Sequence, residues 1–408
     1  MRRSAFVAGC AAAATALHGG APVGALPSAQ LTLGDEVFLD RTWRELEGRT
    51  VGLVTNQTGV TSSLETLVDA IIRHGNIALR ALYSPEHGLR GERTAGAYVG
   101  SYTDLRTGLP VYSLYGATRH PTGAMLAGID VLLFDIQDVG DRAYTYISTL
   151  AYVMQAARTY DKEVWVLDRP NPIGGRRVEG PVLDPKFASF IGLYPLAVRH
   201  GLTVGEIAKL YNDHFEIKCK LRVVPMQGYT RDMLWPDTGL HWVRTSPNVP
   251  TWQTALVYPA TGLLSYAGIN NGVGTAKPFA FAGGYRVDAA RLADELAQRD
   301  VPGVRFDAAA WSPASGFWAG KSLSGVELVV TDPQAFTAVR AAVEILVALR
   351  KTAPGSLAIS AAGLDRDWGT DTLRHGLSAG QDAGAILAHW KPGTRAFETL
   401  RSRFLMYA

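Results

Sequence analysis

The segment TVGLVT at residues 50–55 is almost continuously apolar and predicts a buried β-strand. Similar apolar runs follow it and alternate with amphipathic helical patterns. We expect strands at 77–83, 131–136 and 163–167, and a helix at about 148–160. Continuous apolar strands that alternate with helices indicate a parallel sheet covered on both faces. The fold class predicted from this pattern is α/β, with a Rossmann-like parallel sheet in the N-terminal domain.

The first helix after this strand is expected to begin at Ser62, because Ser62 and Glu65 have the spacing of a capping box. The pattern then changes in the last third of the chain. There we expect helices at 289–299, 333–350, 382–390 and 394–404, and strands at 303–307 and 325–331. This predicts a smaller α+β C-terminal domain. The predicted division is a signal peptide at 1–29, a Rossmann-like catalytic domain at 30–265 and the smaller domain at 266–408.

The composition limits the classes of partner. The chain has 408 residues, 47% of them hydrophobic, with 40 Lys and Arg against 37 Asp and Glu. The formal net charge is only +3, whereas nucleic-acid binding usually needs a dense basic face. We therefore expect no nucleic acid partner. The sequence carries no signal for an oligomeric state.

The N-terminus has the pattern of an export signal. Arg2 and Arg3 precede a short apolar run at 5–17, and small residues follow as far as Ala25. Apolar sequence continues after Cys10 and almost none precedes it, which favours cleavage over lipid attachment at this cysteine. No other run approaches the roughly 20 apolar residues of a transmembrane helix. An exported protein, periplasmic or extracellular, is predicted.

The first strand is not followed by a nucleotide-binding loop. The Gly-x-Gly-x-x-Gly fingerprint is missing, and TNQTG stands at 55–59 instead. No H-E-x-x-H pattern, no H-x-H pattern and no cysteine pair with metal-ligand spacing occurs either. We therefore expect no nucleotide cofactor and predict no metal ligands.

Acidic side chains follow three of the predicted strands. The sequences are SPEHGLRG at 84–91, DIQDVGDR at 135–142 and DRPNP at 168–172. In open parallel sheets, ligands bind at the carboxyl ends of the strands. We therefore expect one crevice to collect four acids: Glu86, Asp135, Asp138 and Asp168.

Each of these acids also has a purely structural interpretation. Asp168 suits a turn with a salt bridge, Asp135 suits a brace for a neighbouring loop, and Asp138 suits either a site or loop support. Glu86 follows the rigid Pro85 in a loop that is rich in glycine, which suits a side chain presented to a ligand. Clustered carboxylates fit glycoside hydrolysis, and with histidines they also fit hydrolysis by a divalent metal.

In combination, these stretches resemble the exo-β-N-acetylmuramidase family. Further matching stretches are GLVTNQTGV at 52–60, YTY at 144–146, VEGP at 178–181, HGLTVGE at 200–206 and SPNVPT at 246–251. The resemblance implies an enzyme that removes N-acetylmuramic acid from the non-reducing ends of peptidoglycan fragments, disaccharides or muropeptides. It also implies a Rossmann-like domain, a smaller C-terminal domain, a cleft between them and no cofactor.

The resemblance makes Glu86 the catalytic candidate, as general acid/base. Asp138 or Asp168 is predicted as the second carboxylate, with His87 and Arg142 orienting the acids. Aromatic residues of the middle segment, among them Tyr258, are candidates for stacking on sugar rings. Arg90, Arg142 and Arg169 are candidates for binding an anionic group such as the lactyl carboxylate of muramic acid. The full predicted substrate-binding set is Asn56, His87, Arg90, Asp135, Gln137, Arg142, Tyr144, Tyr146, Arg169, Asn171, His200 and Asn248.

One stretch departs from the family pattern. Ser265 stands where the family usually has a glutamate and Val273 where it has an arginine, and Lys277 offers a replacement positive charge. These changes motivate a second hypothesis, an exported sugar-binding protein that has lost turnover. A third hypothesis, a metal-dependent hydrolase, predicts inactivation by a chelator.

Overall fold

The computed structural model describes residues 31–408. The predicted signal peptide and Cys10 lie outside the described residues. Within residues 31–408, no helix is long and apolar enough to cross a membrane.

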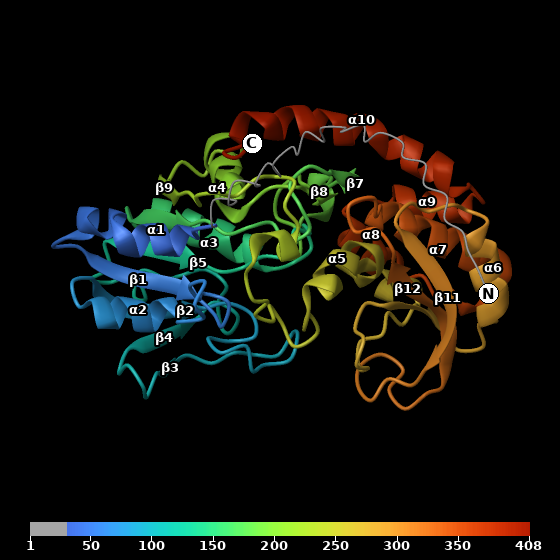
Figure 1. The fold of residues 1–408 in the computed structure, drawn as a ribbon, viewed down its shortest axis with the longest axis horizontal. Coiled ribbons are helices and arrows are strands. Elements are labelled where there is room, and N and C mark those ends of the chain that lie inside the picture. Colours follow the sequence, from blue (N-terminus) through green and yellow to red (C-terminus); the bar gives the residue numbers. More distant parts are fainter. Residues whose placement is uncertain (1–30) are drawn as a thin grey trace, which may run out of the picture. The chain divides into compact units, whose positions relative to one another are not determined.

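The N-terminal half is built on a seven-stranded sheet with the order β3-β4-β2-β1-β5-β6-β9 (Figure 1). All its strands pair in parallel except β3, which is antiparallel to β4. The strands are β1 Thr50–Thr55, β2 Ala78–Ser84, β3 Tyr102–Thr103, β4 Pro110–Ser113, β5 Val131–Asp135, β6 Glu163–Leu167 and β9 Lys220–Val224. The predicted α/β class is confirmed, and the first and last of the four predicted strands have the expected bounds.

The sheet is covered on both faces because successive side chains of each strand point to opposite sides. In β5, Val131 and Leu133 join the apolar cluster of α1 and α2, whereas Leu132 and Phe134 join the cluster of α3 and α4. A strand that is buried on both faces has to be apolar at every position, which explains its sequence. These helices are α1 Gly34–Asp40, α2 Leu67–His74, α3 Tyr146–Thr159 and α4 Val204–Asp213.

The predicted helix start at Ser62 is wrong. Helix α2 begins at Leu67, and the Thr66 side chain caps it by accepting a hydrogen bond from the Asp69 amide at 3.2 Å. Ser62 instead donates its amide (2.9 Å) and its hydroxyl to the Glu36 carboxylate. Both segments have cap-like spacing, and a tertiary contact to Glu36 decided which of them caps the helix.

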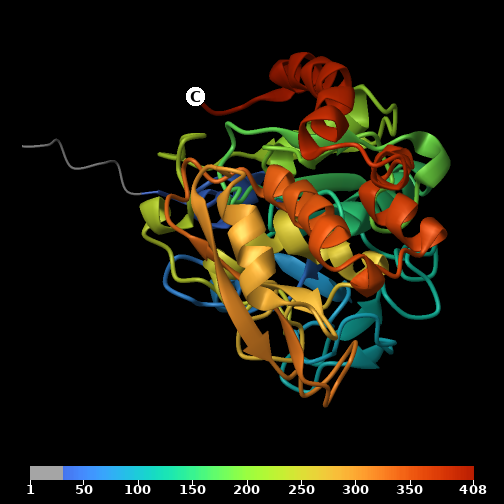
Figure 2. The same ribbon diagram turned by 90° about the vertical axis from the view of Figure 1, so that its right-hand side faces the viewer.

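The C-terminal half contains a three-stranded antiparallel sheet of order β10-β12-β11, with α6 and α7 beside it (Figure 2). The remaining elements are β7 Glu179–Val182, β8 Ala197–Arg199, α5 Trp252–Thr261, β10 Phe281–Gly284, α6 Ala289–Ala297, β11 Val304–Trp311, β12 Leu323–Val330, α7 Ala338–Thr352, α8 Ala361–Trp368, α9 Thr372–Ser378 and α10 Ala383–Arg401.

Three of the expected helices in this half differ from the structure. The long helix predicted from residue 333 begins at Ala338, because the Asp332 carboxylate accepts the amides of Gln334 and Ala335 and holds them in a turn. The two helices predicted at 382–390 and 394–404 are one helix, α10, with Pro392 inside it. The hydroxyl of Thr394 donates to the Trp390 carbonyl at 3.0 Å, one turn back across the proline.

Candidate active site

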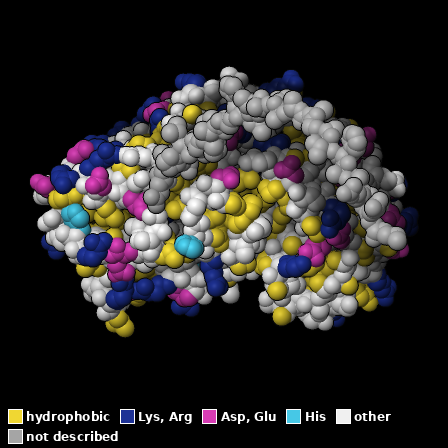
Figure 3. Space-filling view, viewed as in Figure 1, with side chains coloured by type: hydrophobic (Ala, Val, Ile, Leu, Met, Phe, Trp, Pro, Cys, Tyr) yellow, Lys and Arg dark blue, Asp and Glu magenta, His cyan; other side chains and the backbone are white. Residues whose placement is uncertain are grey.

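A cavity of about 190 Å³ lies at the carboxyl ends of β2 and β5, where the sheet was expected to bind a ligand. We call it the Glu86 cavity. Helix α5 and the segment before β10 complete its wall. Figure 3 shows hydrophobic side chains gathered in the middle of the face that it draws, between the regions of β1 and β11. The cavity is lined by Glu86, His87, Ala95, Ala143, Tyr144, Thr145, Ile191, Ser246, Asn248, Val249, Tyr258 and Phe279.

Glu86 is held in this wall by two hydrogen bonds. Its Oε1 accepts from the Gly96 amide at 2.9 Å, and its Oε2 accepts from the Thr145 hydroxyl at 2.8 Å. The side chain is only 7% exposed. Thr145 immediately precedes α3, so a rigid helix start positions one donor. A carboxylate that is fixed at both oxygens in a cavity wall is suited to act on a bound substrate.

His87, the next residue, has a left-handed backbone with φ of 72°, which is uncommon for a residue other than glycine. Its Nδ1 lies 2.8 Å from the Arg93 carbonyl. Because a carbonyl only accepts, Nδ1 donates in this contact. The bent backbone and the ring contact place His87 in the cavity beside Glu86, as predicted.

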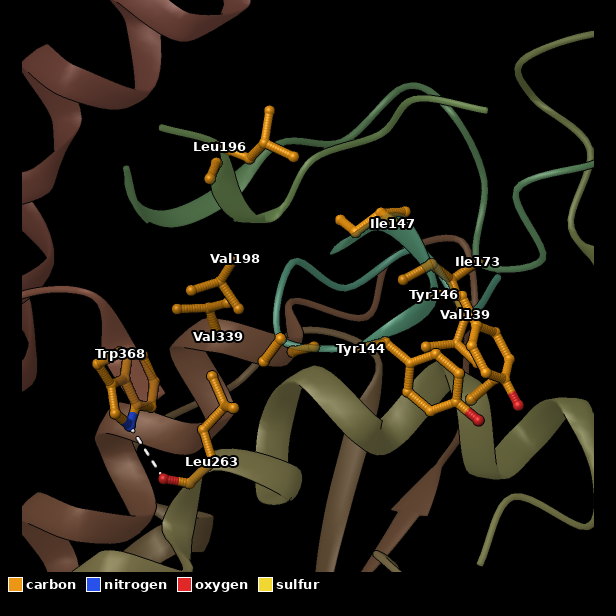
Figure 4. Close-up of a cluster of buried hydrophobic side chains, with 14 of the residues drawn as sticks. Val139, Tyr144, Tyr146, Ile147, Ile173, Leu196, Val198, Leu263, Val339 and Trp368 are labelled. Atoms are coloured by element: carbon orange, nitrogen blue, oxygen red, sulfur yellow. Dashed lines mark hydrogen bonds between the residues drawn. The ribbon is translucent and has the colours of Figure 1, made fainter. Parts of the chain in front are cut away.

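Tyr144 and Tyr146 lie side by side with their ring planes nearly perpendicular and their ring centroids 5.1 Å apart (Figure 4). The Tyr144 hydroxyl donates to Thr245 Oγ1 at 2.8 Å, and the Tyr146 hydroxyl donates to the Thr245 carbonyl at 2.5 Å. Burial raises the pKa of both phenols, and the nearby charges of Asp138 and Glu86 raise it further. Of the two rings, Tyr144 lines the cavity.

Asp138 is buried near this tyrosine pair but does not line the Glu86 cavity. Its Oδ2 accepts from the Gly140 amide at 2.7 Å, and its Oδ1 has no hydrogen-bond partner. Burial raises the pKa of Asp138 to about 7 and lowers the pKa of His200 to about 3. His200 Nε2, 4.0 Å from Asp138 Oδ2, also lacks a partner. Asp138 and His200 therefore form a buried polar pair with unused hydrogen-bonding capacity.

Asp168 is fully engaged in the fold. Its Oδ1 accepts from the amides of Arg169 and Gly205, and its Oδ2 accepts from the hydroxyls of Thr203 and Tyr407. Burial raises its pKa to about 6. The structure does not place this predicted second carboxylate in the Glu86 cavity, because local amides and the C-terminal tail occupy both of its oxygens.

Asp135 and Arg169 belong to a buried ion cluster that includes Asp35, which sequence reasoning had not included. Arg169 Nε donates to Asp135 Oδ1 at 2.5 Å, and its Nη2 donates to Asp35 Oδ2 at 2.8 Å and to the Val60 carbonyl. The structural interpretation of Asp135 as a brace agrees with this geometry. Neither residue lines the Glu86 cavity.

The other predicted cations are also engaged elsewhere. Arg90 pairs with Asp104 at 2.6 Å, and the fully buried Arg142 donates Nη2 to the Asp367 carbonyl at 2.7 Å. Burial lowers the pKa of Arg142. Arg142 therefore connects the loop after β5 to the end of α8 and does not line the cavity, and its Nε and Nη1 have no hydrogen-bond partner.

The predicted amides divide into two groups. Asn248 lines the Glu86 cavity, whereas Asn171 supports a turn, donating Nδ2 to the Leu202 carbonyl at 3.0 Å. Asn56 and Gln137 meet through Thr58, whose hydroxyl donates to Asn56 Oδ1 at 2.6 Å and accepts from the Gln137 amide at 2.9 Å. Asn56 Nδ2 and Gln137 Oε1 are buried without a partner.

The two changed positions of the altered stretch lie outside the lining of the Glu86 cavity. Neither Ser265 nor Val273 lines it. Lys277, offered as a substitute positive charge, pairs with Glu327 at 2.5 Å.

Sequence reasoning missed several residues of this site. Thr145 was quoted within YTY, but its role as a donor to Glu86 depends on a contact between residues 59 apart. Gly96, Ser246 and Phe279 carried no signal of their own. Among residues 31–408, no group of three or more His, Cys, Asp or Glu is placed to hold a metal ion.

An acidic side chain fixed in the aromatic-lined wall of a cavity, at the carboxyl edge of a parallel sheet, is the kind of site that glycoside hydrolases use. The comparisons with known proteins identify the family. Residues 51–253 match the N-terminal model of the exo-beta-N-acetylmuramidase NamZ, and residues 256–407 match its C-terminal model. The chain belongs to this family of glycoside hydrolases.

Known relatives agree over nearly the whole chain. The peptidoglycan beta-N-acetylmuramidase NamZ of Bacillus subtilis strain 168 is 42% identical over 375 residues, which cover 92% of this chain and 91% of that protein. Two crystal structures of DUF1343 family proteins from Bacteroides fragilis are similar. The first has a TM-score of 0.87 at 35% identity, covering 94% of this chain and 100% of that one. The second has a TM-score of 0.73 at 26% identity, covering 93% and 99%.

Proposed function

We propose that this chain is an exported glycoside hydrolase that removes N-acetylmuramic acid from the non-reducing ends of peptidoglycan-derived disaccharides or muropeptides. One observation carries the proposal: Glu86 stands in a cavity wall with both carboxylate oxygens held, by the Gly96 amide and the Thr145 hydroxyl. We infer the identity of the sugar, N-acetylmuramic acid, from the similarity to the Bacillus muramidase. The basic and apolar N-terminal pattern supports export.

In this proposal Glu86 is the general acid/base, which moves a proton to or from the glycosidic oxygen as the bond to the leaving sugar breaks. Asp138 is the better second carboxylate. One of its oxygens has no protein partner, and its charge acts on the same tyrosine as that of Glu86. Asp168 is less suited because both of its oxygens are occupied.

The test is release of free N-acetylmuramic acid from the disaccharide MurNAc–GlcNAc by wild type and by Glu86→Gln. We expect kcat to fall by about 10²- to 10⁴-fold in the variant, the range of general acid–base catalysis. Glu92→Gln is the matched control, because it removes an exposed carboxylate from the same loop. Its kcat should stay near that of wild type.

Asp138→Asn and Asp168→Asn separate the two candidates for the second carboxylate. We expect Asp138→Asn to lower kcat in a protein that remains folded, and Asp168→Asn to act through stability. Full turnover in Glu86→Gln would move the acid elsewhere. No turnover by wild type, together with tight binding of the disaccharide, would establish the sugar-binding alternative.

A further inference from the structure

None of the three arginines predicted to meet the anionic group of the substrate lines the Glu86 cavity. Arg90 pairs with Asp104, Arg142 is buried against the Asp367 carbonyl, and Arg169 bridges two buried aspartates. The proposed sugar nevertheless carries a carboxylate on its lactyl group. Recognition of that group requires another cation within reach of the Glu86 cavity.

Arg119 lies on an aromatic platform formed by Tyr115, Tyr152 and Phe190, which we call the aromatic shelf. The guanidinium carbon of Arg119 is 4.2 Å from the Phe190 ring centroid and 5.0 Å from that of Tyr115. The Tyr115 and Phe190 centroids are 5.7 Å apart, and Tyr152 stacks on Phe190 at 5.8 Å. Stacking on two rings orients the guanidinium and leaves its N–H edge open for a planar anion.

The aromatic shelf adjoins the Glu86 cavity. Ile191, the residue after Phe190, lines the cavity. The Tyr115 phenol is close enough to both charges to respond to them. Burial is the main cause of its raised pKa, the Glu86 carboxylate raises it further, and the Arg119 guanidinium opposes the rise. Tyr115 therefore stands near both the catalytic candidate and the cation on the shelf.

Arg119 is also an unneutralised charge. Its side chain is exposed, and no Asp or Glu among residues 31–408 lies within 4.0 Å of it in an ion pair, unlike Arg90, Arg169 and Arg176. An arginine without a carboxylate partner in the protein can still form two parallel N–H···O bonds to a carboxylate of a ligand. The arginines that form ion pairs already use N–H groups to bind a carboxylate of the protein, so we do not infer this capacity for them.

We propose that Arg119 is a specificity residue of the Glu86 cavity and binds the lactyl carboxylate of the muramic acid ring. This inference rests on the proposed function, because it takes the sugar from there. According to this proposal, the enzyme distinguishes muramic acid from neutral amino sugars through a cation on the aromatic shelf. The arginines that follow the strands of the sheet do not make this distinction.

The experiment is a double-mutant cycle in which one change is made in the Arg119 side chain and the other in the lactyl carboxyl group of the substrate. Wild type, Arg119→Met and Arg119→Lys are compared on a chromogenic N-acetylmuramic acid glycoside and on the same glycoside with its lactyl carboxyl converted to the amide. Met retains an unbranched apolar chain over the shelf, and Lys retains the charge without the fork. Arg176→Met is the matched control, since it removes an exposed arginine that pairs with Asp232.

For the acid substrate, we expect Arg119→Met to raise KM roughly 10- to 100-fold, the value of a hydrogen bond to a charged group, with a smaller rise for Arg119→Lys. For the amide substrate, the variants and wild type should be equal. A glycoside with alanine coupled to the lactyl group moves the carboxylate outward. A dependence on Arg119 that appears only with that substrate would assign the residue to a peptide carboxylate and overturn the proposal.

Two further outcomes would also overturn it. Equal losses on acid and amide substrates would make Arg119 a support of the shelf, and no loss on either would remove it from the site. Wild type without any turnover would instead count against the proposed function. In that event, calorimetric binding of free N-acetylmuramic acid and its amide to the same variants still tests Arg119.

Discussion

At the scale of single residues, the carboxylates of this chain have different roles because their hydrogen-bond partners differ. Glu86 accepts two hydrogen bonds in a cavity wall, whereas Asp168 accepts four and is buried away from it. Asp135 is used in an ion cluster with Arg169. All three acids follow a strand of the sheet. The hydrogen-bond donors around each acid decide whether it faces a ligand.

The Thr145 hydroxyl leads to a prediction at this scale. Thr145→Val removes the donor to Glu86 Oε2 with little change in side-chain volume. We expect kcat on MurNAc–GlcNAc to fall about tenfold or more, because hydrogen bonds to charged groups contribute roughly 1.5–3 kcal/mol. Steady-state kinetics with a thermal melt checks it.

Thr159→Val is its control. It removes a hydroxyl from the same helix α3, one that donates only to the Gln155 carbonyl on the exposed surface. Its kcat should match wild type. Equal kcat in Thr145→Val and wild type would show that the Glu86 carboxylate is positioned without this hydroxyl.

At the scale of elements, a cap-like spacing does not by itself begin a helix. Helix α2 starts after Thr66, although Ser62 and Glu65 have the spacing of a capping box. We predict that Thr66→Ala lowers the free energy of unfolding by about 1 kcal/mol, the usual cost of losing an N-cap. Chemical denaturation measures it.

Ser62→Ala distinguishes the two starts. It removes the hydroxyl contact to Glu36, and it leaves the amide contact and the cap of α2 in place. Hydrogen exchange of the first amides of α2 should therefore accelerate in Thr66→Ala and not in Ser62→Ala. Faster exchange in Ser62→Ala and not in Thr66→Ala would instead indicate that the helix begins at Ser62.

At the scale of the whole molecule, the C-terminal half closes back onto the sheet. Tyr407, near the end of the chain, donates to Asp168 after β6 at 2.6 Å, and Arg142 after β5 donates to the Asp367 carbonyl near the end of α8. These contacts bury several acids at once. Burial raises the pKa of Asp138 and Asp141 to about 7.

A pH dependence of stability follows for Asp141, whose usual pKa is 3.8. Below pH 4 the carboxyl is protonated in both the folded and the unfolded state. Between pH 4 and 7 the unfolded chain releases the proton and the folded chain retains it, so stability falls as pH rises. Asp141→Asn removes this loss while its side-chain oxygen can still accept from the Ala143 amide.

The measurement is the free energy of unfolding of wild type and Asp141→Asn from pH 4 to pH 8. We expect the variant to gain on wild type by several kcal/mol across this window, because one pKa unit corresponds to about 1.4 kcal/mol. Thr159→Val, which removes a hydroxyl that donates only to the Gln155 carbonyl, should run parallel to wild type. A constant difference between Asp141→Asn and wild type would contradict the raised pKa.

Much of the fold was predictable from the sequence because buried parallel strands are short, apolar and local. β1 and β6 have the predicted bounds, β2 and β5 differ by a residue at their ends, and β3, β4 and β9 were not predicted. The position of Glu86 at the carboxyl edge was predicted from the sequence, and His87, Tyr144 and Asn248 were predicted as substrate-binding residues; all four line the Glu86 cavity. These properties depend on residue pattern within a single element.

Only the tertiary structure decided which strand-end residues face the cavity. Asp168 is occupied by Tyr407, which lies 239 residues further along the chain, and Arg142 by the carbonyl of Asp367, 225 residues further along. Arg119 stacks on Phe190, which is also far from it in the sequence, and no sequence pattern indicates this contact. Hydrogen bonding and stacking between distant segments leave no periodic pattern in the sequence. The sequence therefore determined the sheet and its acidic edge, and long-range packing divided that edge into a site and its supports.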